Sequence, residues 1–423
     1  MTTEMKRHTF GEALVRTACR SCGGPLATVF ADLGVQPPAN SYLPNAAAIS
    51  SERAYPLRAM VCSDCKLVQV DTDVPPGELF FDYAYFSSFS PSWLAHAKAF
   101  TQMATTRFGL NQNSFVVELA SNDGYLLKNF VADAIPCLGI EPSDTVAAAA
   151  EQIGVKTLVE FFGVDVARSV AQAQGKADLI VANNVWAHIP DLTDFTAGIA
   201  ELLKDNGVAT IEVQHLLRLM EHVEFDTIYH EHFEYYSLLA AERVFARAGL
   251  RVFDVEELKT HGGSLRYFVC HAAAPHPEGA TLKKVRADEA AANLKDLATY
   301  ARFAERVATC REALLEMLTA AKAEGKTVAA YGAAAKGNTL LNFCGVSTDL
   351  IVCVADKNPH KQNKLLPGSH IPIVSPEALM AQKPDYVLIL PWNLKDEIIA
   401  QLADIRTWGG RFITPVPTAT IWD

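Results

Sequence analysis

The segment Val116-Val117-Glu118-Leu119-Ala120-Ser121-Asn122-Asp123-Gly124 joins an apolar run to a polar turn. The apolar part favours a buried strand, and Tyr125-Leu126-Leu127 behind the turn favours the start of a helix. A helix N-terminus at such a turn offers free backbone N–H groups to a carboxylate or a phosphate. The segment therefore predicts a Rossmann-like unit with a ligand at this turn.

The side chains of the turn favour a cationic ligand over a pyrophosphate. Glu118 and Asp123 are acidic, and Glu141, about twenty residues further on, ends the next apolar run, where an acid accepts hydrogen bonds from ribose hydroxyls. S-adenosylmethionine combines a sulfonium, an ammonium and a ribose, so it fits this pattern. Ala120 and Asn122 stand where such loops usually carry glycine, and a plain turn without a ligand is the alternative.

Strand-like and helix-like segments alternate on both sides of the turn. Strand signals occur at 115–119, 136–140, 155–158, 178–182, 207–213 and 265–270, and helical signals at 91–108, 124–132, 143–153, 163–173, 192–204 and 237–248. A second, smaller block has strand signals at 328–331, 350–355, 386–390 and 412–415, behind linking helices within 280–324. This alternation predicts an α/β protein with two mostly parallel, doubly wound units.

Two Cys-x-x-Cys pairs precede these units, and their members are Cys19, Cys22, Cys62 and Cys65. Two such pairs supply the four thiolates of a tetrahedral, structural zinc site. A thioredoxin-like redox motif is the alternative, but it needs only one pair. We expect residues 11–80 to form a zinc-binding domain, 81–280 an S-adenosylmethionine-binding domain, and 281–423 linking helices with a smaller Rossmann-like domain.

Composition restricts the class of protein. The chain of 423 residues has a formal net charge of −11, which disfavours a nonspecific nucleic-acid binder. Its apolar runs are too short for a membrane span, and its first residues lack the apolar core of a signal peptide. An odd number of cysteines, nine, argues against a disulfide framework. We therefore expect a cytoplasmic protein that binds neither nucleic acid nor membranes.

Polar clusters follow the later strands. Asn183 and Asn184 leave an apolar strand and lead to His188, at the edge where open α/β sheets bind ligands. Tyr229-His230-Glu231-His232 can provide a base, an orienting group and a hydrogen-bond donor. The alternatives are a His-x-His metal site, a polar surface turn and, for His188, a structural histidine. His261-Gly262-Gly263-Ser264-Leu265-Arg266 adds a cation that can pair with an anion.

The second block carries a turn of its own. Gly332-Ala333-Ala334-Ala335-Lys336-Gly337-Asn338 joins a strand to a helix and places a lysine at an anion-binding loop. Asp356 ends the next strand, where an acid meets ribose in a dinucleotide fold, but the full Gly-x-Gly-x-x-Gly fingerprint is absent. The diphosphate of a nucleotide sugar fits this turn, and NAD or a scaffold without a ligand are the alternatives.

Together these motifs resemble one family over nearly all of residues 15–420. It is the S-adenosylmethionine-dependent C-methyltransferases of nucleotide deoxysugar biosynthesis, arranged as a zinc-binding domain, a methyltransferase core and a Rossmann-like C-terminal domain. The markers are the cysteine pairs, Tyr83-Ala-Tyr-Phe-Ser-Ser, Glu118-Leu-Ala-Ser-Asn-Asp-Gly, Asn183-Asn-Val-Trp-Ala-His, Tyr229-His-Glu-His-Phe, His261-Gly-Gly-Ser-Leu-Arg and Gly332-Ala-Ala-Ala-Lys-Gly-Asn. Within the family, the chain looks most similar to the carbon-3 methyltransferases of D-tetronitrose biosynthesis.

The resemblance implies methyl transfer to carbon 3 of a dTDP-linked 3-amino-2,3,6-trideoxy-4-keto hexose in antibiotic biosynthesis. The ketone acidifies the proton on carbon 3, a base removes it, and the enolate attacks the sulfonium methyl. The resemblance places the base in the Tyr-His-Glu-His segment, with His232 as the base and Glu231 as its orienting or assisting partner. Tyr229, Tyr83 and His188 then bond the enolate oxygen or shape the pocket.

The resemblance also implies the binding residues. The cofactor would contact Glu118, Ala120, Ser121, Asn122, Asp123, Glu141, Phe162, Asn183 and Asn184. The dTDP-sugar would contact Arg266, Lys336, Asn338 and Asn393. Methylation of carbon 5 in a related 4-keto sugar, an NAD-dependent nucleotide-sugar oxidoreductase and a nucleotide-sensing zinc protein are the rival interpretations. We expect a monomer.

Overall fold

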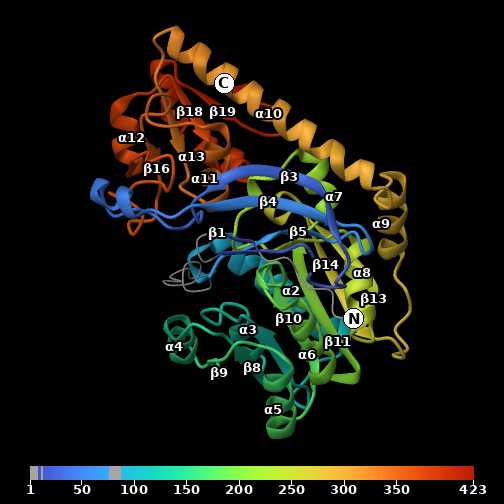
Figure 1. The fold of residues 1–423 in the computed structure, drawn as a ribbon. Helices are drawn as coiled ribbons and strands as arrows, with labels where there is room; N and C mark the ends of the chain where they lie inside the picture. The colour runs from blue at the N-terminus through green and yellow to red at the C-terminus, as the bar shows by residue number, and fades with distance from the viewer. Residues whose placement is uncertain (1–7, 11–12, 76–86) are drawn as a thin grey trace.

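The computed structural model describes residues 8–10, 13–75 and 87–423 (Figure 1). Its largest sheet has seven strands in the order β13-β14-β11-β10-β7-β8-β9. Five of them run parallel: β7 (Val116–Leu119), β8 (Cys137–Ile140), β9 (Thr157–Leu158), β10 (Ala177–Asn183) and β11 (Leu203–Gln214). β14 (Ser264–His271) is antiparallel to β11, and β13 (Leu250–Leu258) is antiparallel to β14. The chain order reverses between β7 and β10, and open α/β sheets bind ligands at such a switch point, beyond the carboxyl ends of the strands.

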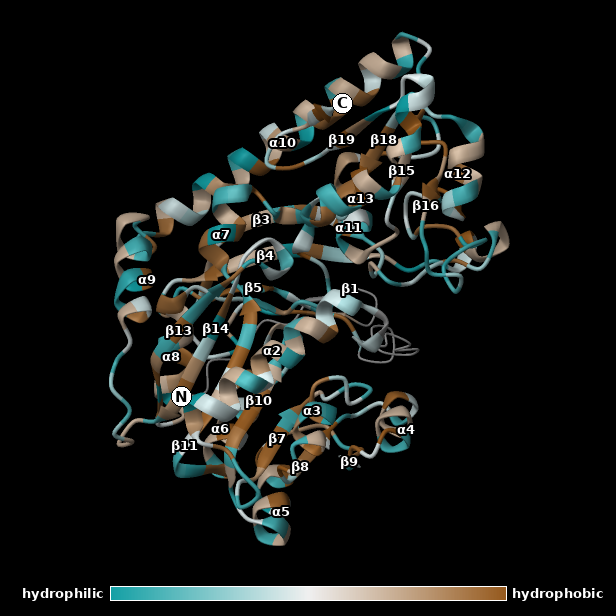
Figure 2. Ribbon diagram, turned by 180° about the vertical axis from the view of Figure 1, so that it is seen from behind, coloured by the Kyte–Doolittle hydropathy of each residue, from teal (hydrophilic) through white to brown (hydrophobic). Residues whose placement is uncertain are grey.

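Helices cover both faces of this sheet. Alternate side chains of β10 enter two separate apolar clusters, Ile180 and Ala182 in one and Leu179 and Val181 in the other. The helices of this part are α2 (Pro91–Phe108), α3 (Leu127–Ala132), α4 (Asp144–Gln152), α5 (Val164–Gln174), α6 (Leu192–Leu202), α7 (Leu216–His222) and α8 (Leu238–Arg247). The strands appear as apolar ribbons between helices with polar outer faces (Figure 2). The predicted doubly wound architecture is confirmed.

The N-terminal part forms two small sheets. One has the order β12-β5-β4-β3 and contains β3 (Leu26–Gln36), β4 (Tyr55–Cys62) and β5 (Val68–Val70). Its fourth strand, β12 (Glu234–Tyr235), comes from the segment behind the Tyr-His-Glu-His motif. The other sheet contains β1 (His8–Phe10), β2 (Ala13–Val15) and β6 (Thr72–Asp73). The larger unit therefore contributes a strand to the sheet of the cysteine-rich part.

The C-terminal part follows the linking helices α9 (Ala280–Ala291) and α10 (Leu297–Ala323). Its sheet has the order β17 (Ile373–Val374), β16 (Val354–Ala355), β15 (Val328–Tyr331), β18 (Tyr386–Ile389), β19 (Arg411–Thr414) and β20 (Thr420–Trp422), parallel except for β20. The helices α11 (Ala335–Cys344), α12 (Pro376–Gln382) and α13 (Lys395–Gln401) accompany it. This second α/β unit is as expected, although regular pairing of the predicted strand at 350–355 begins only at Val354.

One apolar cluster joins the three parts of the chain. Phe30 and Leu57 of the N-terminal sheet, Leu219 and Phe225 of the larger unit, and Leu340 of α11 all belong to it. The long helix α10 lies along β3 (Figure 1), where the rings of Phe30 and Phe303 stack at a centroid distance of 4.3 Å. Burial of this cluster fixes the N-terminal and C-terminal parts against the larger unit. No helix among the described residues has the length and apolar character needed to cross a bilayer.

Candidate active site

The turn after β7 adopts a backbone that normally requires glycine. Ala120 and Asn122 have φ angles of 52° and 50°, and Gly124 has 75°. The left-handed region costs an L-residue about 1–2 kcal/mol. The two residues that replace the usual glycines thus keep the glycine-like path of the turn. Alternating left-handed residues of this kind turn successive backbone N–H groups toward one point.

Three carboxylates surround this turn, and the described residues provide no ion pair for them. Glu118 is buried with Oε2 unpartnered, and burial together with the charges of Glu141 and Asp123 raises the pKa of Glu118 well above its usual value. Oδ1 of Asp123 is also unpartnered. The Glu141 carboxylate accepts from the backbone N–H groups of Asn122 and Ser143, both at 3.0 Å. Buried carboxylate oxygens that lack partners, on Glu118 and Asp123, fit the sulfonium, ammonium and hydroxyl groups of S-adenosylmethionine.

The remaining predicted cofactor residues lie around the same edge of the sheet. β10 pairs with β7 so that Val181 faces Glu118, which places Asn183 beside the turn. Asn184 follows with φ 53°, and its backbone N–H donates to the Glu212 carbonyl at 2.7 Å. Ser121 is fully buried with Oγ unpartnered, whereas Phe162 is partly exposed and packs edge-on against the ring of Phe195 at 5.3 Å.

A pair of substitutions tests the backbone of this turn. Gly124→Ala combines a left-handed φ with a new Cβ at 3.0 Å from Cγ2 of Val155, so we expect the unfolding free energy to fall by about 1–3 kcal/mol. Ala120→Gly relieves a left-handed alanine and is expected to keep or raise stability. Thermal unfolding and S-adenosylhomocysteine titration measure both variants. Equal stability losses in the two variants would contradict the proposed turn.

The Tyr-His-Glu-His segment lies against the loop that leaves β10. The backbone N–H of Phe233 donates to the Ala187 carbonyl at 2.7 Å, and the Tyr236 hydroxyl donates to the Trp186 carbonyl at 3.1 Å. Both acceptors lie in η3 (Trp186–His188), directly beyond the carboxyl end of β10. The rings of His188 and His232 meet at a centroid distance of 4.6 Å. The segment therefore sits at the same edge of the sheet as the cofactor turn.

His232 is held in one orientation by two hydrogen bonds. Its Nδ1 lies 3.0 Å from the carbonyl oxygen of Thr227, which can only accept, so Nδ1 carries the proton. Its Nε2 is then the basic nitrogen and accepts from the Tyr229 hydroxyl at 2.6 Å. Burial lowers the pKa of His232 well below its usual value, with a smaller contribution from His188, so the ring is neutral at neutral pH. A neutral imidazole with an oriented lone pair is suited to remove a proton.

Glu231 and His230 point to different surroundings. Glu231 is 6% exposed, Nδ2 of Asn40 lies 2.9 Å from both of its carboxylate oxygens, and burial raises its pKa to about 7. Nε2 of His230 instead donates to the carbonyl oxygen of Pro56 at 3.2 Å. His230 and His232 therefore do not converge. Within the described residues, the group with the spacing of a metal site is the four-cysteine cluster, so a His-x-His metal site has no support.

The predicted substrate residues fall into two groups. Lys336 bonds Oδ1 of Asn393, and its Nζ lies 4.4 Å from the centroid of the Trp392 ring. Nε1 of Trp392 donates to Asp226 at 2.7 Å, in η4 (Phe225–Thr227) just before the Tyr-His-Glu-His segment. This lysine thus lies where the C-terminal unit meets the segment. Asn338 is more enclosed, and its Nδ2 donates to the Ala39 carbonyl at 2.5 Å.

Arg266 is buried and its charge is balanced within the protein. Its guanidinium donates to Glu212 at 2.7 Å and to Glu256 at 2.6 Å, and it lies over the ring of Phe100. The preceding glycines are explained by packing, since a Cβ at Gly262 would lie 2.4 Å from Oε1 of Glu224. The geometry therefore gives no support to Arg266 as a partner for a substrate anion. Tyr83, the remaining predicted catalytic residue, lies outside the described residues.

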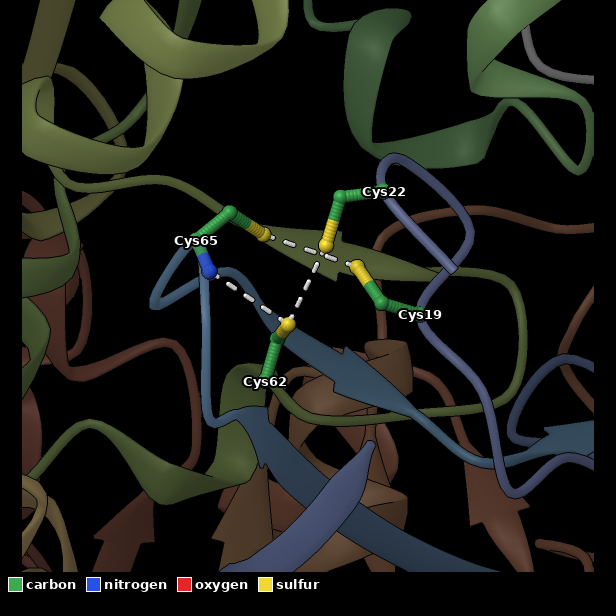
Figure 3. A group of neighbouring side chains, drawn as sticks. All are labelled: Cys19, Cys22, Cys62 and Cys65. Carbon is green, nitrogen blue, oxygen red and sulfur yellow. Dashed lines mark hydrogen bonds between the residues drawn. The ribbon is translucent and has the colours of Figure 1, made fainter. Parts of the chain in front are cut away.

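The four cysteines form one compact cluster (Figure 3). Their Sγ atoms lie within 4.8 Å of one another, with Cys19 to Cys65 at 3.6 Å and Cys22 to Cys62 at 3.4 Å. A tetrahedral zinc with Zn–S bonds of about 2.3 Å has S···S edges of about 3.8 Å, so the cluster fits the ion. Nε2 of Gln69 donates to the Cys19 sulfur at 3.1 Å, a bond that stabilises thiolate charge.

Arg20, between the two cysteines of the first pair, contacts the residues that follow the Tyr-His-Glu-His segment. The Arg20 guanidinium, 1% exposed, lies 3.5 Å from the Glu234 carboxylate and 4.7 Å above the ring of Phe233. The backbone N–H of Val70 donates to the Phe233 carbonyl at 2.9 Å, next to the pairing of β5 with β12. The residues directly after His232 thus rest on the zinc-binding part.

Comparison with protein families covers most of the chain. A zinc binding domain matches residues 19–80, a methyltransferase domain matches 93–255, and a C-methyltransferase C-terminal domain matches 259–417. The C-methyltransferase NovU of Streptomyces niveus is 36% identical over 399 residues, which cover 94% of this chain and 95% of NovU. This match runs through all three parts of the chain.

Two solved structures resemble parts of this chain. An S-adenosylmethionine-dependent methyltransferase from Clostridium acetobutylicum matches 44% of this chain and 92% of its own, with 15% identity and a TM-score of 0.34. The magnesium protoporphyrin IX methyltransferase ChlM of Synechocystis, solved with bound S-adenosylmethionine, matches 42% and 79%, with 11% identity and a TM-score of 0.33.

The matched zinc-binding domain agrees with the cysteine cluster. The matched methyltransferase domains and the similarity to NovU agree with the acidic turn at the switch point of the large sheet. S-adenosylmethionine and zinc are therefore the cofactors, as the sequence predicted. The chain belongs to the S-adenosylmethionine-dependent C-methyltransferase family that carries a zinc-binding domain and a C-terminal C-methyltransferase domain.

Proposed function

We propose that the enzyme methylates carbon 3 of a dTDP-linked 3-amino-2,3,6-trideoxy-4-keto hexose through an enolate, in antibiotic deoxysugar biosynthesis. The observation that carries this proposal is the Tyr229–His232 pair, which presents a neutral imidazole at the sheet edge that also carries the cofactor turn. Methyl transfer to carbon requires an electron-rich carbon, and a ketone beside a C–H bond allows one to form when a base is in place. The family match to C-methyltransferases supports the same chemistry.

Each residue of the site has a separate role in the proposed reaction. Bound S-adenosylmethionine would supply an electrophilic methyl group, and the turn at Ala120–Gly124 together with Glu141 would hold it. The C–H bond at carbon 3 breaks as His232 takes the proton on Nε2, and the electron pair moves into the enolate. The Tyr229 hydroxyl then donates to the enolate oxygen, which lowers the energy of that charge. His188 packs against His232 and excludes water from one side of the ring. The enolate carbon then forms the C–CH₃ bond as the S–CH₃ bond breaks, the electron pair of the broken bond stays on sulfur in S-adenosylhomocysteine, and the ketone re-forms. The proton leaves His232 for solvent.

The nucleotide is proposed to lie between the C-terminal unit and the Tyr-His-Glu-His segment, residues 229–232, which we call the catalytic segment. Lys336 supplies a positive charge there, although burial lowers its pKa, and Asn393 adds a polar side chain at the same place. Asn338 orders the neighbouring loop through Ala39. Arg266 is not part of the proposed set because Glu212 and Glu256 already balance its charge.

Activity is expected to depend on the ionisation of Glu231. Burial raises the pKa of Glu231 to about 7, so its carboxylate form dominates above that pH and is lost as the pH falls through it. We expect kcat/KM to fall about tenfold per pH unit below this value. His188, whose pKa is lowered to about 4 by burial, does not titrate in this range. Rates from pH 5 to pH 9 measure this fall of kcat/KM at low pH, the acid limb of the profile. Glu231→Gln should lack it, and a wild-type profile that stays flat down to pH 5.5 would contradict the assignment.

Calorimetric titration separates this function from its rivals. We expect S-adenosylhomocysteine and dTDP to bind, each at one site, and NAD not to bind. Binding of NAD without S-adenosylhomocysteine would favour the oxidoreductase. Nucleotide binding without any methyl transfer to 4-keto sugars would favour a sensor. The position of the new methyl group in the product, read by NMR, distinguishes carbon 3 from carbon 5.

The oligomeric state and the cellular compartment of the enzyme are part of the same proposal. None of the nine cysteines forms a disulfide, and four of them make up the zinc cluster, which suits the reducing cytoplasm where nucleotide sugars would be modified. We propose a monomer because the described parts of one chain already bring the catalytic segment, the cofactor turn and Lys336 together. Sedimentation at micromolar concentration checks the mass, and a stable dimer would overturn this part of the proposal.

A further inference from the structure

We propose that Asn40 is a positioning residue for methyl transfer, which fixes the Glu231 carboxylate and connects it to the C-terminal loop 332–338. Asn40 lies between β3 and β4, in the N-terminal part of the chain. The inference rests on the proposed place of Glu231 in the active site. It adds a residue from a third part of the chain to a site built by the large sheet.

Asn40 is the hydrogen-bond donor that the Glu231 side chain uses among the described residues. Nδ2 of Asn40 lies 2.9 Å from each carboxylate oxygen. Glu231 is 6% exposed, whereas Asn40 is exposed, so the amide stands between the buried carboxylate and solvent. Removal of this donor leaves a buried carboxylate without a side-chain partner in the described part of the chain, a state that proteins avoid.

The backbone around Asn40 is anchored to the C-terminal unit on both sides. The carbonyl oxygen of Ala39 accepts from Nδ2 of Asn338 at 2.5 Å, and the Tyr42 hydroxyl donates to the Ala333 carbonyl at 2.6 Å. Leu43 exchanges two backbone hydrogen bonds with Leu365, at 3.0 and 2.8 Å. Pro37 and Pro38 limit the backbone that leads into this stretch. The position of the Asn40 amide therefore follows the position of the C-terminal loop.

The neutrality of this donor matters for the chemistry. A lysine or arginine at this place would hold Glu231 permanently ionised, whereas an amide orients the carboxylate and only modestly favours its charged form. Among the described residues, the groups that face Glu231 are Asn40, Tyr42, whose pKa is raised by burial, by Asp356 and by Glu231, and His188, which bonds the Glu231 backbone. Loss of the Asn40 bond should therefore move the acid limb of the rate profile upward.

Two substitutions of Asn40 test the assignment in the full-length zinc protein. Asn40→Leu keeps the size but removes the donor, and we expect kcat to fall about 10- to 100-fold with KM for S-adenosylmethionine within about twofold. Its acid limb should move to higher pH, and Asn40→Asp should move it further because a second carboxylate faces Glu231. Tyr42→Phe, which removes the anchor to Ala333, should shift kcat in the same direction by a smaller factor.

Asn45→Ala is the matched control. Asn45 is exposed and caps η1 (Ala46–Ser51) by accepting from the Ala47 backbone, five residues away from Asn40. Its kcat and acid limb should match the wild type. Zinc content and melting temperature, measured on every variant, show whether a loss of rate is a loss of fold.

A double substitution separates the failure of this inference from the failure of the proposed function. If Asn40 acts through Glu231, Asn40→Leu should cost little further rate in the Glu231→Gln background. A normal rate in Glu231→Gln would remove the proposed role of Glu231 itself. A slow Glu231→Gln beside a wild-type rate and pH profile in Asn40→Leu would overturn the role of Asn40 alone. Fully additive losses would also overturn it, because Asn40 would then act elsewhere.

Discussion

Replacement of His232 by asparagine is expected to lower turnover at least ~100-fold while S-adenosylhomocysteine binds with nearly unchanged affinity. The asparagine amide can still donate to the Thr227 carbonyl, which now receives the Nδ1 proton at 3.0 Å. It provides no counterpart of Nε2, the nitrogen that accepts from Tyr229 at 2.6 Å. The substitution therefore removes the basic atom and keeps the local backbone contact. Single-turnover rates and calorimetry measure the two quantities separately.

His276→Asn is the control for this experiment. His276 stacks on Phe253 at 4.7 Å and bonds the carbonyl of Asn206, which lies near the amino end of β11, away from the carboxyl edge of the sheet. Its turnover should stay within about twofold of the wild type. Turnover near the wild-type rate in His232→Asn would remove His232 as the base and direct attention to Tyr229 or His188.

Loss of zinc is expected to abolish most activity although the ion contacts no reacting atom. Cys62→Ser removes one of four thiolates, and the binding free energy of a structural zinc is also folding free energy, so stability should fall by several kcal/mol. Arg20 would then no longer be fixed against Phe233 and Glu234, the residues that follow His232. We expect turnover to drop at least tenfold, measured together with zinc content and the melting temperature.

Cys353→Ser provides the matched substitution outside the cluster. The Cys353 thiol donates to Gln382 at 3.7 Å, and a serine hydroxyl can keep that bond. This variant should retain zinc and turnover. Full activity of a zinc-free Cys62→Ser protein would contradict the link between the knuckle and the catalytic segment.

Local patterns predicted most of the large sheet, because its strands are apolar runs that end in polar turns. The turn at Ala120–Gly124, the edge at Asn183 and the four cysteines all lie where the sequence placed them. β13 (Leu250–Leu258) was missed, since the adjacent apolar pair Val252-Phe253 and the adjacent acidic pair Glu256-Glu257 break its alternation, and its ladder shifts register between Val252 and Asp254. β3 (Leu26–Gln36) was missed as well, since three register shifts break its alternation.

Contacts between distant parts of the chain could not be derived from local pattern. Asn40 meets Glu231 across 191 positions, and its loop of prolines and small residues carries no motif. Trp392 reaches Asp226 across 166 positions, and the tautomer of His232 depends on the carbonyl of Thr227, a backbone atom that no side-chain pattern reveals. Arg266 is the opposite case. Its residue type suggested an anion as its partner, but only the fold shows the carboxylates of Glu212 and Glu256 that balance its charge.

Solvent exchange at the carbon beside the ketone tests the proposed chemistry most directly. The enzyme is incubated in D₂O with the 4-keto sugar nucleotide and S-adenosylhomocysteine, which has no methyl group to give, and the sugar is examined by NMR. Removal and return of the proton by His232 predicts deuterium at carbon 3, at a rate that falls at least ~100-fold in His232→Asn. Retention of hydrogen at carbon 3 by an enzyme that still methylates that carbon, or equal exchange in both proteins, would contradict the account.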